Sequence, residues 1–577
     1  MFSRYTNFRD YLVRHFDFVA ICFLLLVSAV LFFPLINIPG ISSDACSFVR
    51  ESADGAMPWM AWDSHRPFRT TTWNFLCLIA GYSTVGLHAL AASLHLLCSL
   101  LLYVTVVLVW PKQRFFAFAA AILRLTWTTA LREGVDDLIL EGLLPEMLMW
   151  VAIVLWLALE SWSPNRNYRI PIRILYGITI FLSMGMYEAG WSNLGAIPLI
   201  IALIGKVDIR NRHTLVNLAC WYGTMTVYVL FYFLHFSHHG KPPNSQINFG
   251  LIAPIWLTFT QVLFVESWTV AFDMWGGLLK EGWHWIIPII VGAAFFVVAF
   301  LASRTDRLKE SEKCHWGKYL TVAIVWAFAS YLHIALGLSN VYGNVVEWGS
   351  RLVLPMSYSM TFLAVVIIGF VGSKLKHRKW TWMICAAMAL TIINAGVIVR
   401  AWKTLPELYL HQETIHQLIA KAVPSLDPGT VIVFEAEGFM YHKSNPREFE
   451  DIMFSYLLRN EYGVRDLYVF FNSKEHPVVM EGDVVKADVS LAYPIEEEKR
   501  DGTAGIGANE RYFLCRTWKD LGSPEPTKEV EIERSAVIWL RYLGDRFEVI
   551  KEKSNLNRIG SEMDPVHAKI LRMATSE

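Results

Sequence analysis

Acidic and basic side chains of this chain lie next to its apolar segments, at positions that would face a membrane surface. Asp44 follows the first apolar segment, Asp136 and Asp137 follow the third, and Arg351 precedes the tenth. A carboxylate partly shielded from water can take a proton from an attacking hydroxyl or amine. It can instead help to hold a divalent cation, such as Mg²⁺ or Mn²⁺, beside a phosphate leaving group. Because arginine binds phosphate in a bidentate geometry, this combination predicts chemistry on a lipid phosphate.

Further candidates lie in the loop of Asp44 and in the turn after the fifth apolar segment. The additional candidate site residues are Asp63, His65, Arg66, Tyr187 and Glu188. Several candidates have structural alternatives, which stay open at this point. Asp44 could belong to a turn, Asp136-Asp137 could be loop residues or a helix N-cap, Asp63 and His65 could cap a helix that begins near Arg69, and Glu188 could form a polar turn.

Other residues with chemical potential are interpreted as structural. His88 and His95 lie one heptad apart on an apolar segment, and we interpret them as buried hydrogen-bonding histidines rather than metal ligands. The eight cysteines show no CxxC or other metal-ligand spacing, and most of them lie in apolar runs. They therefore indicate neither a zinc site nor a disulfide framework.

The composition is that of a polytopic membrane protein. Of the 577 residues, 54% are hydrophobic and only 18% are charged, against about 25% charged residues in ordinary soluble domains. The mean hydropathy is +0.37. These values exclude a disordered protein, a coiled coil and an ordinary cytosolic enzyme. The 51 basic residues balance 51 acidic ones, so the overall charge indicates no nucleic-acid partner.

Eleven apolar runs are long enough to be candidates for membrane crossing, which takes about 20 helical residues. We expect helices at 17–36, 86–110, 115–131, 144–160, 172–187, 190–205, 214–236, 283–302, 318–338, 352–372 and 380–400. The first run is not a cleavable signal, because it has spanning length and no small-residue cleavage site follows it.

The distribution of Lys and Arg predicts the orientation. With a cytoplasmic N-terminus, the inside segments carry 20 Lys/Arg in 64 residues and the outside segments carry 7 in 113. Cytoplasmic loops are enriched in these residues, so we expect this orientation. An odd number of spans then places the C-terminal part, residues 401–577, outside the cytoplasm.

Two outer loops, 37–85 and 237–282, are long. In the second, apolar and aromatic residues recur at helical spacing, which predicts a helix lying in the membrane interface; an extra span at 251–271 is the alternative. The residues that define the pattern are Trp256, Phe259, Val262, Leu263 and Trp268.

Residues 401–577 form a separate, water-facing domain in this interpretation, because they hold 22 basic and 30 acidic residues. A helical stretch at 405–423 is followed by a strand at 431–434, a helix at 446–460 and a strand at 467–471, which predicts a right-handed βαβ unit. We expect later strands near 511–516, 529–540 and 546–551. The predicted fold class is thus an α-helical membrane protein, in residues 1–400, with a small C-terminal α/β domain.

The ordered set of motifs resembles the GT-C superfamily of membrane glycosyltransferases, which includes protein mannosyltransferases and aminoarabinose transferases. The resemblance covers roughly residues 10–400. It consists of an early acid in the first outer loop (Asp44), the segment His65-Arg66-Pro67-Phe68, acids in the second outer loop (Asp136 and Asp137) and the pair Tyr187-Glu188. A C-terminal outer domain is also typical of this group.

The resemblance implies a polyprenyl-phosphate-linked sugar as donor and a protein, lipid or glycan as acceptor. Asp44 would act as base or metal-linked acid, and Asp136 and Asp137 would share acceptor or metal contacts, with Asp44 and Asp137 as ligands of any divalent cation. Arg351 would bind the donor phosphate, with Arg66 and His65 stabilising charge on the leaving group. Two alternatives remain: a non-catalytic membrane subunit that binds a partner through its outer domain, and a transporter, which would require matched halves and charges near the bilayer midplane.

Overall fold

The structure is a computed structural model of the chain, and it divides into two compact units. The first comprises Met1–Asn37 and Pro58–Lys403, and the second Ile38–Met57 and Thr404–Glu577. The residues that the structure describes are 15–37, 49, 52, 55, 57, 59–60, 67–111, 113–127, 140–162, 166–187, 190–204, 207–238, 267–307, 316–330, 356–375, 378–435, 458, 462, 467–472, 477–490 and 527–560.

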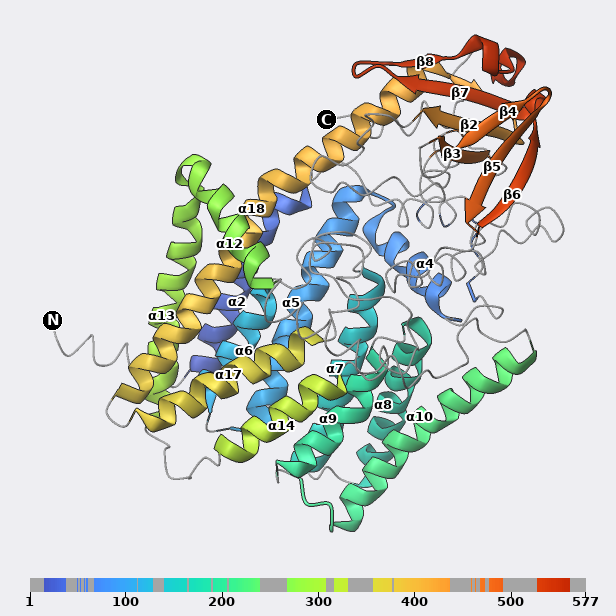
Figure 1. Cartoon of the computed structure of the whole chain (residues 1–577). Helices are drawn as coiled ribbons and strands as arrows, with labels where there is room; N and C mark the ends of the chain where they lie inside the picture. The colour runs from blue at the N-terminus through green and yellow to red at the C-terminus, as the bar shows by residue number, and fades with distance from the viewer. Residues whose placement is uncertain are drawn as a thin grey trace. The chain divides into compact units, whose positions relative to one another are not determined.

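The first unit consists of helices (Figure 1). Their bounds are α2 Phe16–Ile36, α4 Arg69–Ala80, α5 Thr84–Val109, α6 Arg114–Thr126, α7 Leu140–Trp162, α8 Arg166–Met186, α9 Trp191–Leu203, α10 Arg212–His238, α12 Ser267–Lys280, the 3₁₀ turn η6 Gly282–Trp285, α13 Ile286–Arg307, α14 Trp316–Ala329, α17 Met356–Lys374 and the start of α18 Lys379–Ala422. Each of the eleven expected spans overlaps one of these helices. Within the described residues, eight helices are long and apolar enough to cross a membrane, while α9 and α14 are apolar but shorter.

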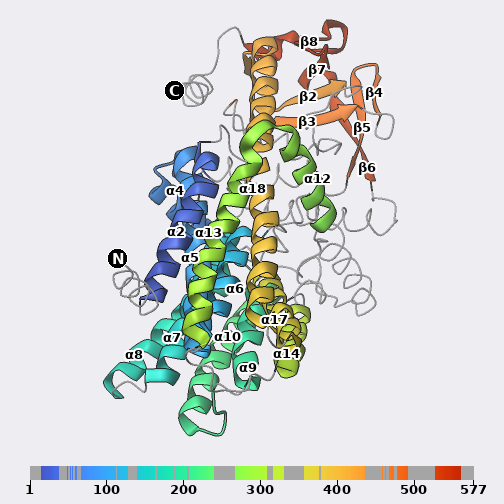
Figure 2. The same cartoon turned by 90° about the vertical axis from the view of Figure 1, so that its left-hand side faces the viewer.

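Helix α6 lies at the centre of this unit. Every residue from Phe115 to Thr126 is buried, and the helix packs against α2, α5, α13 and α17 (Figure 2). Apart from Arg114, Arg124 and Thr126 the helix is composed of apolar residues, which suits an interior position. The surrounding helices instead expose apolar faces, as Phe18, Leu26 and Phe33 do on α2. Such faces suit contact with lipid, and they agree with the predicted membrane class.

The structure corrects one sequence expectation for the helices, and it describes only part of the segment of a second one. The expected span 380–400 and the expected helix 405–423 form one continuous helix, α18, because Pro406 removes only one backbone hydrogen bond without ending the helix. Of the residues that define the expected interfacial helix, only Trp268 is among those described, and it belongs to α12. At 14 residues, α12 is about 21 Å long, which is too short to span. Residues 251–266 lie outside the described part.

The second unit contains the end of α18 and three small sheets. The strands are β1 Ser425–Leu426, β2 Thr430–Glu435, β3 Leu467–Asn472, β4 Val478–Glu481, β5 Val484–Ser490, β6 Thr527–Glu533, β7 Val537–Tyr542, β8 Phe547–Val549 and β9 Ile559–Gly560, and short 3₁₀ turns lie at Arg534–Ala536, Lys551–Lys553 and Leu556–Arg558. The largest sheet has the order β3-β2-β7-β8, the second β4-β5-β6, and β1 pairs with β9.

The expected strand pair of the βαβ unit is confirmed, because β2 and β3 are parallel neighbours with Thr430 opposite Leu467. The expected strand at 529–540 is instead two strands, β6 and β7, which belong to different sheets. Strand β8 confirms the last expected strand, whereas β4 and β5 were not predicted. The helix expected at 446–460 (apart from the single position 458) and the strand expected at 511–516 lie outside the described residues.

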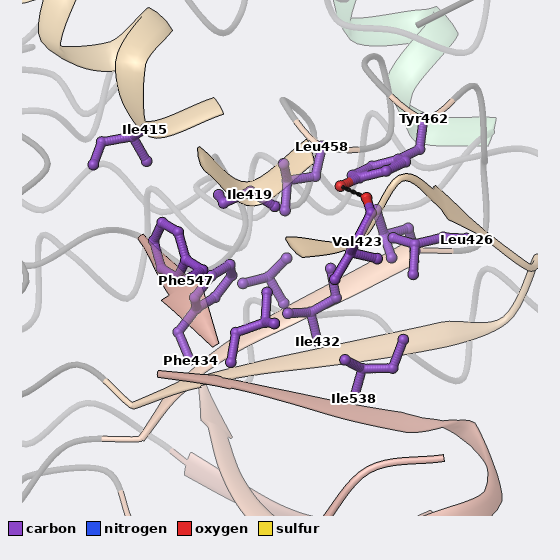
Figure 3. Close-up of a cluster of buried hydrophobic side chains, with 13 residues drawn as sticks. Ile415, Ile419, Val423, Leu426, Ile432, Phe434, Leu458, Tyr462, Ile538 and Phe547 are labelled. Carbon is purple, nitrogen blue, oxygen red and sulfur yellow. Dashed lines mark hydrogen bonds between the residues drawn. The ribbon is translucent and has the colours of Figure 1, made fainter. Parts of the chain in front are cut away.

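The alternation of side chains along β2 explains how its sheet is covered on both faces. Ile432 and Phe434 face the end of α18, where they pack with Ile419 and Val423 (Figure 3). The Tyr462 hydroxyl donates to the Val423 carbonyl at 2.7 Å on the same face. The other face, which includes Val431 and Val433, packs with Val485 and Ala487 of the β4-β5-β6 sheet. This unit therefore has two small cores of its own.

A charged cluster at the end of β2 makes a testable contribution to the stability of the second unit. The Glu435 carboxylate accepts from Arg541 Nε at 2.6 Å and from Lys553 Nζ at 3.2 Å. The hydrogen bond from Arg541 is the main cause that lowers the pKa of Glu435; burial opposes it and Lys553 adds to it. Because the folded-state pKa is depressed, this stabilisation is present above the ordinary Glu pKa and is lost as pH falls through the folded pKa.

We therefore expect Glu435→Gln to remove about 1 kcal/mol of stability at neutral pH and to flatten the loss on acidification. Calorimetric unfolding of the detergent-solubilised chain between pH 3 and pH 7 measures both. Glu481→Gln is the matched control, because Glu481 makes a more exposed pair with Lys486 at 2.9 Å in the other sheet. An unchanged pH profile in Glu435→Gln would contradict the assignment.

Candidate functional site

Only one of the nine sequence-predicted site residues is among the described residues. Tyr187 follows the end of α8, is buried, and donates its backbone N–H to the Ser183 carbonyl at 3.4 Å. The others lie outside the described part of the chain, so their mutual placement remains a prediction. These are Asp44, Asp63, His65, Arg66, Asp136, Asp137, Glu188 and Arg351.

The residues that flank these positions are described, and the first contact between them joins α4 to α8. Phe68 directly follows the His65-Arg66-Pro67 segment, and its backbone N–H donates to the Gly185 carbonyl at 3.1 Å. The Phe68 ring packs over Gly185 and lies 5.9 Å, centroid to centroid, from the ring of Phe181. The backbone at Phe68, two residues after Arg66, is therefore hydrogen-bonded to the backbone at Gly185, two residues before Tyr187.

The close approach of Phe68 depends on the missing side chain at Gly185. A Cβ atom at this position would overlap the Phe68 ring and lie 3.2 Å from Tyr228 Cε2. We expect Gly185→Ala to destabilise the folded chain by about 1–3 kcal/mol, because the ring must move out of a packed position. Thermal unfolding in detergent measures the change.

Gly177→Ala, on the same helix, is the matched control. A Cβ atom there would lie 3.4 Å from Thr224 Oγ1, which is an ordinary contact. The control should be neutral or stabilising by up to about 1 kcal/mol, since alanine favours a helix over glycine. Equal effects of the two substitutions would show that the Phe68 contact is not tight.

The end of α8 is also bonded to the start of α7. The Ser183 hydroxyl donates to the Pro145 carbonyl at 2.8 Å, and both residues are in buried surroundings. Residue 146 is the next along α7, which begins three residues after Asp137. The ends of α4, α8 and α7 that adjoin predicted site residues therefore meet through direct hydrogen bonds.

A buried polar cluster extends this meeting point to α6 and α17. The Glu146 carboxylate accepts from the Tyr358 hydroxyl at 2.6 Å and pairs with Arg124 at 3.5 Å. The Tyr358 hydroxyl in turn accepts from Arg124 Nη2 at 3.1 Å, and the guanidinium carbon lies 4.4 Å from the centre of the Tyr358 ring. The side chains of Arg124 and Glu146 are only 1% and 3% exposed. This is an ion pair inside a membrane domain.

His95 of α5 completes the cluster. Its Nε2 lies 3.1 Å from the Leu125 carbonyl and its Nδ1 lies 3.1 Å from Arg124 Nη1. Both contacts are satisfied when Nε2 carries the proton and Nδ1 accepts from the arginine, which is the neutral form of the ring. The interpretation of His95 as a buried hydrogen-bonding histidine is confirmed. His88, on the same helix, is also buried.

The cluster is not fully satisfied. Within the described residues, three of its buried atoms lack a hydrogen-bond partner: Glu146 Oε1, Arg124 Nε and the indole Nε1 of Trp150. Trp150 lies one turn after Glu146 on α7, and its ring is 4.9 Å from that of Tyr358. Each unsatisfied buried polar atom costs about 1–3 kcal/mol. Replacing a buried ion pair with apolar side chains of similar volume is often neutral or stabilising.

Together these contacts place residues that flank four candidate segments at one end of the helical unit. The four segments contain His65-Arg66, Asp136-Asp137, Tyr187-Glu188 and Arg351. Arg124 precedes the segment with Asp136 and Asp137, and Glu146 follows it; Tyr358 follows Arg351 by seven residues. Sequence reasoning missed Arg124, Glu146 and Tyr358 because it considered the loops. Arg124 was detectable as a lone cation in the run Phe-Ala-Ala-Ala-Ile-Leu-Arg-Leu.

The described residues offer no metal centre. Among them, no group of three or more His, Cys, Asp or Glu side chains is arranged to hold a metal ion. A divalent cation would therefore have to be held by residues elsewhere in the chain, and Asp44 and Asp137 are the two that the sequence predicts.

Comparison with known proteins finds similarity among solved structures but not among sequences. No protein-family profile matches the sequence, and no curated protein matches it. The structure is similar to the crystal structure of ArnT from Cupriavidus metallidurans bound to undecaprenyl phosphate, with a TM-score of 0.33 and 13% sequence identity over 74% of this chain and 83% of that one.

Proposed function

We propose that this chain is an integral-membrane, inverting glycosyltransferase, which moves a sugar from a polyprenyl-phosphate donor to an acceptor on the extracytoplasmic side. The observation that carries the proposal is the convergence at one end of the helical unit. Phe68, Gly185, Pro145, Glu146, Arg124 and Tyr358 are linked there by direct contacts. The segments with the predicted arginines and acids leave from these points, apart from the one with Asp44.

Each predicted residue has a role in this proposal. Asp44 deprotonates or orients the acceptor hydroxyl, and Asp136 and Asp137 bind the acceptor or share a cation. The donor phosphate is bound by Arg351. The remaining candidates lie around the leaving group: Arg66 and His65 stabilise its negative charge, and Asp63, Tyr187 and Glu188 line the site. Any Mg²⁺ or Mn²⁺ would neutralise phosphate charge.

The proposal includes an orientation. The N-terminus lies in the cytoplasm and residues 401–577 lie outside it, which is supported by the excess of Lys and Arg in the inside segments. Single cysteines introduced at positions 44, 136 and 450 should then react with a membrane-impermeant thiol reagent added outside. Labelling of one of them only after permeabilisation would contradict this layout.

Reconstitution tests the activity. The purified chain in lipid nanodiscs, supplied with polyprenyl-phosphate sugars and an extract of acceptor lipids and glycans, should release free polyprenyl phosphate. Binding of a donor without release would favour the non-catalytic subunit. If the chain neither binds a donor nor releases polyprenyl phosphate with any sugar of the panel, the proposal is overturned. A transporter is less well supported, because the sequence shows no pair of matched halves and its candidate charges flank the apolar runs.

A further inference from the structure

The buried ion pair connects both flanks of one candidate segment. Arg124 lies two residues before the end of α6, and Glu146 lies in the second turn of α7. Residues 127 and 140 are the described ends of the intervening segment, which contains Asp136 and Asp137. A contact between Arg124 and Glu146 therefore fixes the separation and the relative rotation of the two helix ends from which that segment leaves.

Tyr358 connects a second candidate segment to the same pair. Its hydroxyl accepts from Arg124 Nη2 and donates to Glu146 Oε2, so one group joins α17 to both α6 and α7. Tyr358 is in the first turn of α17, seven residues after Arg351. Displacement of Glu146 would consequently affect the helix that follows Arg351 as well as the helices on either side of the two aspartates.

We infer that Arg124, Glu146 and Tyr358 are positioning residues, which hold the helix ends on both sides of the Asp136-Asp137 segment and next to the Arg351 segment in the geometry required for transfer. This inference rests on the proposed function. None of the three residues is required to touch the substrate. The three contacts among these residues are directional, and a directional buried network specifies one geometry where apolar packing would tolerate several.

Glu146→Gln tests the role with minimal change of shape. The amide can still accept from Tyr358, but it removes the charge that holds Arg124. A shift of about 1 Å in catalytic geometry can lower turnover by about 10²-fold. We expect kcat of the folded Glu146→Gln chain to fall by about that factor, while the dissociation constant for undecaprenyl phosphate changes by less than about threefold. Tyr358→Phe should lower kcat in the same direction.

Two matched controls lie away from the candidate segments, one near the C-terminal end of α7 and one in the middle of α8. Glu160 of α7 accepts from Thr214 Oγ1 and Asn217 Nδ2, each at 2.6 Å, and the Tyr176 hydroxyl of α8 donates to the Asn217 carbonyl at 3.0 Å. Glu160→Gln and Tyr176→Phe remove comparable hydrogen-bonding groups away from the candidate segments. Both should leave kcat within about twofold of the unmodified chain when rates are normalised to folded protein.

Amide hydrogen exchange separates this inference from the proposed function, because it requires no turnover. Glu146→Gln should accelerate exchange together at residues 120–127, 140–150 and 356–362, whereas Glu160→Gln should not. Accelerated exchange in a chain that shows no transfer would overturn the proposed function and retain the structural coupling. Normal kcat, or unchanged exchange at these three helix ends in a chain that does catalyse transfer, would overturn the positioning role.

Discussion

Arg124→Met will destabilise the folded chain by about 3–5 kcal/mol, because it leaves the Glu146 carboxylate buried without its positive partner. The substitution keeps a long, flexible side chain in the space, so lost volume is not the main cause. Glu146 retains the Tyr358 hydroxyl at 2.6 Å, but one neutral donor does not compensate a buried charge. Chemical or thermal unfolding in detergent micelles measures the effect.

The double substitution Arg124→Met/Glu146→Met provides the control. It removes both charges, and it should recover a substantial part of the stability that either single change loses, because replacing a whole buried ion pair with apolar groups is often neutral. The resulting coupling between the two sites should exceed about 1 kcal/mol. If Arg124→Met proves as mild as a surface substitution, the ion pair is accessible to water, and the interior position of α6 is wrong.

The helical part of the fold was predictable because apolar run length is a strong local signal. All eleven expected runs overlap helices, and eight of the described helices are long and apolar enough to span; a spanning segment must satisfy its backbone hydrogen bonds internally, which a helix does. What failed was the break expected between residues 400 and 405. Helix α18 continues through these residues and through Pro406 to Ala422, and its end buries Ile415 and Ile419 against the sheet of the second unit.

The strands of the second unit show a different kind of failure. β4 and β5 form a hairpin around Gly482, which has a φ of +64°. A Gly-Asp pair between two valine-containing runs is a recognisable hairpin signal, but Glu481 and Lys486 make these strands resemble an exposed loop. Their inward residues are Val478, Val485 and Ala487. Because the segment as a whole is polar, its half-buried strands β4 and β5 were not predicted from the sequence.

The candidate site was predictable as a set of loops but not as an arrangement. Charge type and position relative to apolar runs indicate where chemistry can occur, and they led to Asp136, Glu188 and Arg351. The contacts among Arg124, Glu146 and Tyr358 join residues up to 234 positions apart. Local patterns contain no information on such partners. An ionisable residue inside an apolar run, such as Arg124, was the one local sign that a partner had to exist.

Asp44→Asn will have the largest effect on activity: we expect transfer from a polyprenyl-phosphate sugar to fall by about 10²–10⁴-fold, the usual contribution of a positioned general base. The amide keeps the size and a hydrogen-bond acceptor of the carboxylate but cannot take a proton from the acceptor. Folding should be unaffected, so the unfolding temperature must stay close to that of the unmodified chain. Steady-state release of polyprenyl phosphate in nanodiscs measures the loss.

Asp208→Asn is the control for Asp44→Asn, because Asp208 accepts a local hydrogen bond from the Arg210 backbone in an exposed turn. The two roles of Asp44 are then separated by their response to conditions. A base that is lost removes the limb of the pH–rate profile on which activity rises with pH, and added Mn²⁺ restores nothing. A cation ligand that is lost weakens metal binding, so millimolar Mn²⁺ recovers part of the rate. Turnover near that of Asp208→Asn would remove Asp44 from the mechanism and leave Asp136 or Asp137 as the base.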